Sequence, residues 1–291
     1  MIIKKNERRF FFLLILFLIL SQLSFRWPVE EKLVTSTFGE SRGDHFHDGM
    51  DLIGPKGDVY PIDSGRLLFF WDKNIFPFEN YPGGGNYKVI KHNSNLTSIY
   101  MHLQDNLWPD QIYTPMKKLG SIGNTGHSFG PHLHFSILDL AQKVSINPFK
   151  ILPDYEDKKE PQISNIYFRI KDNYIFIKNN SLLRLTQSYP LLVKIVDSAQ
   201  RSERLGIYGL KIIFNGQPFS EVIFEKIDYT PQGLEVEKKS FSVLFDEDGF
   251  YKISGLKYLN GENILKVIAS DYAGNRAEKI FTFNLKLDTD L

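Results

Sequence analysis

Short apolar runs separated by turn residues follow one another along the first half of the chain. Runs at residues 65–70, 87–91 and 97–101 alternate with segments rich in glycine, proline, asparagine and aspartate. Short runs bounded by such residues are typical of antiparallel β-strands. No long segment here has the periodicity of an amphipathic helix. The pattern predicts an antiparallel β domain over residues 26–152.

The second half has the same pattern of short apolar runs separated by turn residues. Residues 162–291 contain apolar runs at 191–197, 209–214 and 263–269. The dipeptide Asn215-Gly216 is a strong signal for a tight hairpin turn. Repeated short strands with turn signals predict a β-sandwich. Residues 153–161 are charged and bounded by prolines, and we interpret them as a linker. The expected fold class is therefore all-β, in two domains.

The N-terminus departs from this pattern. Four basic residues precede an unbroken apolar run at residues 10–20, and a polar exit follows to residue 25. This order matches a secretory signal, and the run is shorter than the roughly 20 apolar residues of a membrane span. No Ala-x-Ala cleavage motif is present, so a cleaved signal and a retained anchor both stay open. The alternative of a buried core helix is disfavoured because the run is not amphipathic. Residues 1–25 thus predict export to the periplasm or cell envelope.

Composition narrows the chemistry. Hydrophobic content of 42% and charged content of 24% are ordinary for a globular protein. A net charge of +1 argues against nucleic acid as a partner. The absence of cysteine excludes disulfides, thiolate metal sites, cysteine nucleophiles and a lipid-modified N-terminal cysteine. Any metal or acid–base site must therefore use other side chains.

All seven histidines lie between residues 45 and 134, which places the chemistry in the first half. In His132-Leu133-His134, alternation along a strand aims both imidazoles to one face. Imidazole is the commonest metal ligand and the natural acid or base near neutral pH. Alternation along a further strand likewise predicts that Tyr100 and His102 share a face.

His47 and Asp51 form a second motif, with Gly49 between them so that no side chain blocks the way. In an extended segment both side chains point to one face. Together with one further imidazole they make a set of three ligands, which leaves a catalytic zinc an open position for water. A single histidine at a strand end is more often structural. We therefore interpret Asp48 as a turn residue and assign no function to three other histidines, which are His45, His92 and His127.

Three motifs in this order resemble the lysostaphin/LytM-type zinc metallopeptidases, which cut the peptides of bacterial peptidoglycan. The motifs are His47-Asp48-Gly49-Met50-Asp51, Tyr100-Met101-His102-Leu103 and Gly130-Pro131-His132-Leu133-His134-Phe135. The resemblance covers about residues 34–149. It implies that residues 26–152 are a metallopeptidase domain holding one Zn²⁺ per chain.

The resemblance also implies a role for each site residue. His47, Asp51 and His134 are the expected zinc ligands, and His102 and His132 are the expected catalytic pair. All five are present, which favours an active enzyme because relatives without the ligands act as regulators. The chain departs from the family pattern at Phe129, at Ser136 and in an enlarged loop at residues 72–82. These departures bear on substrate preference and leave the metal site intact.

Residues 209–283 resemble bacterial immunoglobulin-like domains, most clearly in the strand and turn at residues 263–275. This predicts an immunoglobulin-like fold for residues 162–291, and the alternative is a solvated β-sandwich without a ligand of its own.

Three functions follow as hypotheses. The first is a zinc endopeptidase acting on peptidoglycan stem peptides, with the bond cut and the identity of the general base left open. A D-alanyl–diaminopimelate cross-link is preferred over a glycine bridge. The second is a non-catalytic envelope protein that binds peptidoglycan or activates another hydrolase. The third places function in the C-terminal domain, as a module for glycan or for other envelope proteins. A membrane is expected as a partner only through an uncleaved N-terminus.

Overall fold

The structure is a computed structural model that describes residues 25–54, 57–80, 83–104, 108–153, 155–199 and 204–288. The predicted export signal falls outside these residues, apart from Phe25. Within them, no helix has the length and apolar character that crossing a membrane requires. Strands and turns dominate throughout, so the predicted all-β class is confirmed.

The first half is built around one large antiparallel sheet. Its strands run β10-β9-β6-β5-β4-β7, and β2 pairs with β9 off this path. Most of these strands present one face to a core in which Met50, Leu52, Tyr100, Leu133 and Phe135 are fully buried. The strands of this half are β1 (Leu33–Ser36), β2 (Met50–Ile53), β3 (Asp58–Val59), β4 (Gly65–Trp71), β5 (Asn86–His92), β6 (Leu96–Leu103), β7 (Ile112–Tyr113), β8 (Gly120–Ser121), β9 (Leu133–Asp139) and β10 (Val144–Ile146). A single 3₁₀ turn, η1 (Pro148–Lys150), follows β10.

The second half contains two sheets packed on a shared core. One has the order β12-β11-β14-β20, and the other has the order β13-β22-β21-β15-β16. Phe168 and Val193 from the first sheet and Leu265 and Phe283 from the second belong to one buried cluster. This is the predicted sandwich. Its strands are β11 (Gln162–Ile170), β12 (Asn173–Phe176), β13 (Leu182–Leu185), β14 (Leu191–Val196), β15 (Gly209–Phe214), β16 (Gln217–Ile223), β20 (Tyr251–Ile253), β21 (Gly261–Ser270) and β22 (Arg276–Leu287).

The turn between β15 and β16 is the one that the sequence signalled. Asn215 and Gly216 both have positive φ, at 49° and 77°. Such angles at both central residues match the twist of a two-residue hairpin, which asparagine and glycine tolerate best.

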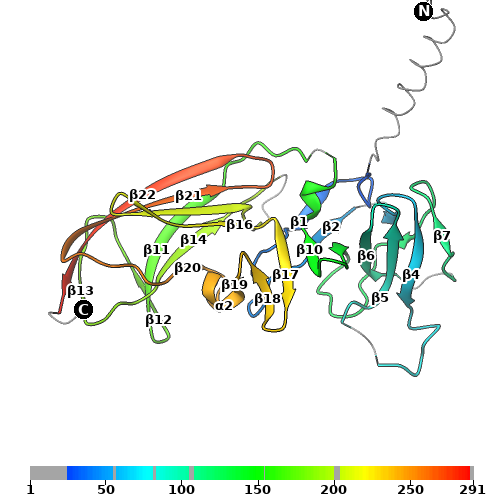
Figure 1. Ribbon diagram of the computed structural model, residues 1–291, viewed down its shortest axis with the longest axis horizontal. Coiled ribbons are helices and arrows are strands. Elements are labelled where there is room, and N and C mark those ends of the chain that lie inside the picture. The colour runs from blue at the N-terminus through cyan, green and yellow to red at the C-terminus, as the bar shows by residue number, and fades with distance from the viewer. Residues whose placement is uncertain are drawn as a thin grey trace, which may run out of the picture.

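A three-stranded insert joins the two halves. β17 (Lys226–Thr230), β18 (Gly233–Val236) and β19 (Lys239–Ser240) belong to the second half in sequence, yet β17 pairs with β10. The sheet of the first half therefore continues into the second, and Figure 1 shows these strands beside the short helix α2 (Phe241–Leu244), between the sandwich and the first sheet.

The hydrophobic cores also cross the linker. Phe38 and Phe46 of the first half are fully buried in the sandwich cluster. Ala199 and Leu205 of the second half belong to the core of the first sheet. The two halves thus pack as one continuous body, and the division at residues 153–161 stays a prediction from sequence.

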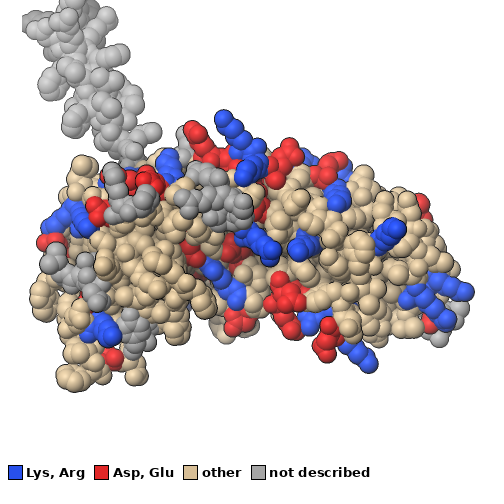
Figure 2. All heavy atoms as spheres, turned by 180° about the vertical axis from the view of Figure 1, so that it is seen from behind, with Lys and Arg blue, Asp and Glu red and all other residues tan. Residues whose placement is uncertain are grey.

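Charges of both signs are mixed on one face of the molecule. On the face in Figure 2, lysine and arginine side chains are interspersed with aspartate and glutamate rather than gathered into one field. This agrees with the net charge of +1.

Candidate metal centre

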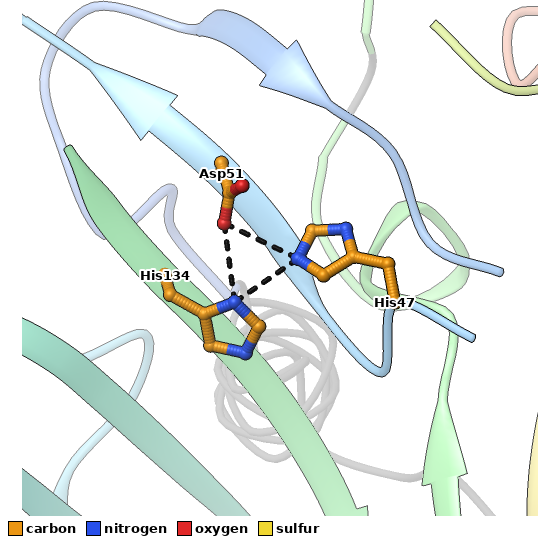
Figure 3. Close-up of side chains that lie close together, drawn as sticks. All are labelled: His47, Asp51 and His134. Carbon is orange, nitrogen blue, oxygen red and sulfur yellow. Dashed lines mark hydrogen bonds and ion pairs between the residues drawn. The ribbon is translucent and has the colours of Figure 1, made fainter. Parts of the chain in front are cut away.

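Three side chains from two segments of the chain meet at one point. His47 Nε2 lies 3.0 Å from His134 Nδ1, Asp51 Oδ1 lies 3.2 Å from His47 Nε2, and Asp51 Oδ1 lies 3.1 Å from His134 Nδ1 (Figure 3). Ligand atoms about 2.0–2.1 Å from a tetrahedral zinc are about 3.3 Å from one another. This triangle therefore fits a metal ion of that size, and all three residues are buried.

Strand pairing sets up this triangle. Asp51 on β2 stands directly opposite His134 on β9, so that their side chains share a face. β9 also pairs with β6, which places the end of β6 with His102 on the other side of His134.

Gly49 allows the close approach that the triangle needs. A Cβ at this position would lie 2.5 Å from the Phe135 carbonyl oxygen, 2.6 Å from Ser136 Oγ and 2.9 Å from His134 Nε2. Sequence reasoning expected glycine to clear the space between His47 and Asp51. The structure shows that it clears the space occupied by the facing strand.

Hydrogen bonds fix which nitrogen of each histidine faces the metal position. His47 Nδ1 donates to the Thr37 carbonyl oxygen at 2.8 Å, which leaves Nε2 as a lone-pair donor. His134 Nε2 lies 2.9 Å from Ser136 Oγ and 3.5 Å from Asp48 Oδ1, which leaves Nδ1 for the metal. The hydrogen-bond partners thus define the protonated nitrogen of each ring. Ser136, which departs from the family pattern, thus supports a metal-facing ring.

Asp51 offers one oxygen to the metal position and keeps the other in an ion pair. Arg42 donates from a guanidinium nitrogen to Asp51 Oδ2 at 2.5 Å and to Ser36 Oγ at 2.7 Å. Burial works to raise the pKa of Asp51, but the charges and hydrogen bonds of His47 and His134 outweigh it and hold the pKa well below 3.8. The carboxylate is therefore ionised, as a ligand must be.

Asp48 is a further carboxylate of this centre. Burial opposes ionisation, but the hydrogen bond and charge of His134 lower the pKa of Asp48 to about 2. The Tyr229 hydroxyl, on β17, donates to Asp48 Oδ2 at 3.1 Å and lies 3.0 Å from Ser145 Oγ. An insert from the second half therefore supports a residue that contacts His134.

His102 and His132 lie beside the triangle, with ring centroids 4.7 Å apart. His102 Nδ1 lies 2.7 Å from the Thr125 carbonyl oxygen, and His132 Nδ1 lies 2.8 Å from that of Gly130. Each ring therefore donates from Nδ1 and presents Nε2. Burial lowers the pKa of His102 to about 4.

The backbone at His102 corrects one sequence prediction. Its φ is +60°, a left-handed conformation that residues other than glycine rarely adopt. This angle breaks the alternation of β6, so Tyr100 is fully buried in the core while His102 lines the site. The expectation that Tyr100 and His102 share a face is therefore wrong. Strain of this kind gathers at functional sites.

The five residues line an open groove. Its walls include His45, His127 and the fully exposed Phe129. Two of the histidines without an assigned function thus stand on the groove wall. His92 instead lies in the interior, 2.7 Å from Ser98 Oγ.

Three residues of this centre were not predicted from the sequence to belong to it. Asp48 was interpreted as a turn residue, although it adjoins His47. Arg42 lies outside the motifs, and only its place nine residues before Asp51 ties it to them. Tyr229 is separated from Asp48 by 181 positions, and no local pattern marks it.

Residues 45–148 match the model of Peptidase family M23. A second family model, which carries no descriptive name, matches residues 160–286. Residues 45–148 are therefore similar to M23 peptidases, and the resemblance to lysostaphin/LytM-type enzymes is confirmed for this region.

Three relatives illustrate the match. "Murein hydrolase activator NlpD" of Escherichia coli is 33% identical over 132 residues, which cover 45% of this chain and 31% of the relative. "Peptidoglycan DD-endopeptidase ShyB" of Vibrio cholerae is 32% identical over 123 residues, which cover 39% and 27%. An "Uncharacterized metalloprotease" of Buchnera aphidicola is 46% identical over 104 residues, which cover 35% and 25%. The chain thus matches about a third or less of the length of these relatives.

Proposed function

We propose that this chain is a zinc-dependent endopeptidase that hydrolyses peptide cross-links of bacterial peptidoglycan. The observation that carries the proposal is the triangle of His47, Asp51 and His134 with two further imidazoles on its open side. The name of the Vibrio cholerae relative supports the substrate class. We infer that the site of action is the periplasm or cell envelope, because peptidoglycan lies there and residues 1–25 have the pattern of an export signal.

The three ligands would hold one zinc ion per chain. When bound, zinc lowers the pKa of a coordinated water towards neutrality and polarises the scissile carbonyl. The ligand set of two imidazoles and one carboxylate is common in catalytic zinc sites, and all three side chains line the groove.

The two catalytic histidines differ in surroundings, which supports different roles. His102 is buried and its lowered pKa keeps it neutral at neutral pH, so Nε2 can accept a proton as general base. His132 is more exposed, and its Nε2 lies 3.8 Å from Asp51 Oδ1. With a proton on Nε2, His132 would donate to the oxyanion or to the leaving amine.

The open groove supports an extended peptide as substrate. Phe129 stands exposed on its wall at the position where the family has a small residue, so its ring is available to contact the peptide. Contacts along the groove wall would determine which peptide binds. The buried triangle of His47, Asp51 and His134 would not discriminate between peptide bonds. The preference for a D-alanyl–diaminopimelate cross-link therefore remains part of the proposal.

Digestion of purified peptidoglycan tests the proposal. Mass spectrometry of the muropeptides before and after chelation and zinc restoration identifies the bond. We expect His134→Ala to lose zinc, and His132→Ala to keep zinc while losing hydrolysis. Full activity of His132→Ala, or no new muropeptide from the zinc-loaded chain, would overturn the assignment.

A second candidate is a non-catalytic envelope protein that activates another cell-wall hydrolase. The name of the Escherichia coli relative favours it. Activation does not require a complete ligand set, and this chain has one, which is why the enzyme is the first proposal. A zinc-loaded chain that leaves peptidoglycan intact but increases its cleavage by an added amidase would support the activator instead.

A further inference from the structure

A second group of carboxylates lies outside the M23 site. Asp157 is in the linker, Asp197 follows β14, and Asp271 follows β21. One oxygen of each lies within 4.8 Å of those of the other two. Asp197 is 4% exposed and Asp271 is 1% exposed. Three carboxylates at this spacing repel one another when all are ionised.

An orphaned atom points to a ligand at this place. Asp197 Oδ1 is buried and has no hydrogen-bond partner among the described residues. Buried carboxylate oxygens are normally paired with a donor or a metal, because burial without a partner is costly. Asp197 is one of the three carboxylates of the cluster. A cation bound among these carboxylates would therefore give the buried Oδ1 atom a partner.

The surrounding hydrogen bonds hold the Asp271 carboxylate and the backbone of Asp157 in place. Asp271 Oδ1 accepts from the backbone N–H of Ala273 at 2.9 Å and of Asn275 at 2.8 Å. The Asn275 side chain donates from Nδ2 to Asp271 Oδ2 at 2.7 Å and to the Asp157 carbonyl oxygen at 3.1 Å. The tip of the sandwich and the linker are thus already tied, and the Asp271 carboxylate is preorganised.

The local charge is not neutralised by these bonds. Burial raises the pKa of Asp197 to about 7, and the charges of Asp271 and Asp157 add to the shift. The positive charge of Lys159 acts in the opposite direction but is the smallest of these influences, and Lys159 is exposed. A divalent cation would supply the charge that this cluster lacks.

We propose that Asp157, Asp197 and Asp271 bind one Ca²⁺. Oxygen-only ligands select a hard cation, which separates this site from the imidazole-containing zinc centre. Oxygens within 4.8 Å of one another can all reach one Ca²⁺, since calcium–oxygen distances are about 2.3–2.6 Å. The ion binds the linker to the sandwich.

The place of the site in the fold gives the ion a structural role. Tyr272, next to Asp271, stacks on Phe149 of the first half with ring centroids 4.7 Å apart, and its hydroxyl donates to the Phe38 carbonyl oxygen. Asp197 itself pairs with Leu205 through a β-bridge. Leu205 and Ala199 both belong to the core of the first sheet. Calcium at this point therefore fixes the junction of the two halves.

Thermal unfolding and calorimetric titration of the purified, zinc-loaded chain test the proposal. We expect one Ca²⁺ per chain and a rise of about 5 °C in the unfolding midpoint at 10 mM CaCl₂ if the dissociation constant is about 0.1 mM. Asp197→Asn should fold in calcium-free buffer, because it removes a repelling charge, and should lose the calcium response. Asp172→Asn, an exposed turn residue outside the cluster, is the matched control and should keep it.

His134→Ala separates this site from the zinc centre, since it should lose zinc and retain the calcium-dependent rise in midpoint. The proposal fails if CaCl₂ produces no rise in the unaltered chain, or an equal rise in Asp197→Asn. An equal rise with 10 mM MgCl₂ would overturn the assignment to calcium.

Discussion

The Tyr229 hydroxyl donates a 3.1 Å hydrogen bond to Asp48, a carboxylate whose other oxygen lies 3.5 Å from the Nε2 atom of His134. Tyr229 belongs to β17, which the second half adds to the sheet edge at β10. Tyr229, which begins this series of contacts, thus comes from the second half. His134, which ends it, faces the candidate metal position. The second half therefore contributes to the candidate centre itself, beyond any separate binding role.

Tyr229→Phe tests this contribution. The change removes the hydroxyl and keeps the ring, so Asp48 loses a donor and His134 loses part of the support that orients it. Because such outer partners typically alter metal affinity or activity about 10- to 100-fold, we expect weaker zinc binding of that order in a competition with a chromophoric chelator.

Tyr174→Phe is the matched control for Tyr229→Phe. Tyr174 also donates its hydroxyl to a carboxylate, Asp246, at 2.8 Å, but this pair lies in the sandwich. Its loss should leave zinc affinity unchanged. Equal zinc affinity in Tyr229→Phe and the unaltered chain would remove the role assigned to β17.

Gly49→Ala should abolish zinc binding and hydrolysis together. The added Cβ would lie 2.5 Å from the Phe135 carbonyl oxygen and 2.9 Å from His134 Nε2, so β2 and β9 must move apart. Gly130→Ala is the control, because a Cβ there meets nothing within 4 Å. Zinc content by atomic absorption distinguishes the two, and a Gly49→Ala protein with one zinc per chain would contradict the argument.

The gathering of these five side chains around one groove was predictable from sequence, because each lies in a short motif of distinctive residue types. His47 and Asp51 flank a glycine, and His132 and His134 alternate on one strand. The ring of contacts around them was not predictable. Tyr229 reaches Asp48 only because β17 pairs with the edge strand β10, and the pairing of an edge depends on register and packing rather than on local pattern.

Backbone conformation was the second source of error. Periodicity assumes a regular strand, so it placed Tyr100 and His102 on one face. The positive φ of His102 turns its side chain to the groove, and no local sequence pattern signals that angle, although histidine adopts it more often than most residues. Strand positions themselves were predicted well, because β4, β5 and β6 coincide with the apolar runs of the first half.

We expect the free energy of unfolding to fall in acid because of the buried side chain of His92. Burial lowers the pKa of His92 below 6.5, and its two nitrogens contact Ser64 O and Ser98 Oγ. The folded state then binds fewer protons than the unfolded state. The contribution of His92 to the free energy of unfolding is complete above pH 6.5. As the pH falls below that value, this contribution is lost by at most about 1.4 kcal/mol per pH unit.

Urea unfolding between pH 7.5 and 5.5 measures this loss. In His92→Gln the acid-dependent part of the free energy of unfolding should shrink, although the variant is less stable at pH 7.5. An identical pH slope in both proteins would assign the acid sensitivity to other groups.

His102→Asn separates the proposed role of His102 as general base from its backbone conformation. Asparagine tolerates the left-handed region far better than alanine, so the variant should keep the turn that φ of +60° requires. His102 contributes no atom to the triangle of His47, Asp51 and His134, and zinc content should stay at one per chain. Loss of a general base should reduce hydrolysis of peptidoglycan about 10²- to 10⁴-fold.

The comparison with His102→Ala completes this test. Alanine should lose the same activity and also lower the unfolding temperature, because it adds backbone strain to the missing base. A His102→Asn protein that cleaves peptidoglycan at the rate of the unaltered chain would move the role of general base to His132. Activity that returns only at raised pH would instead indicate that another group has taken over the proton.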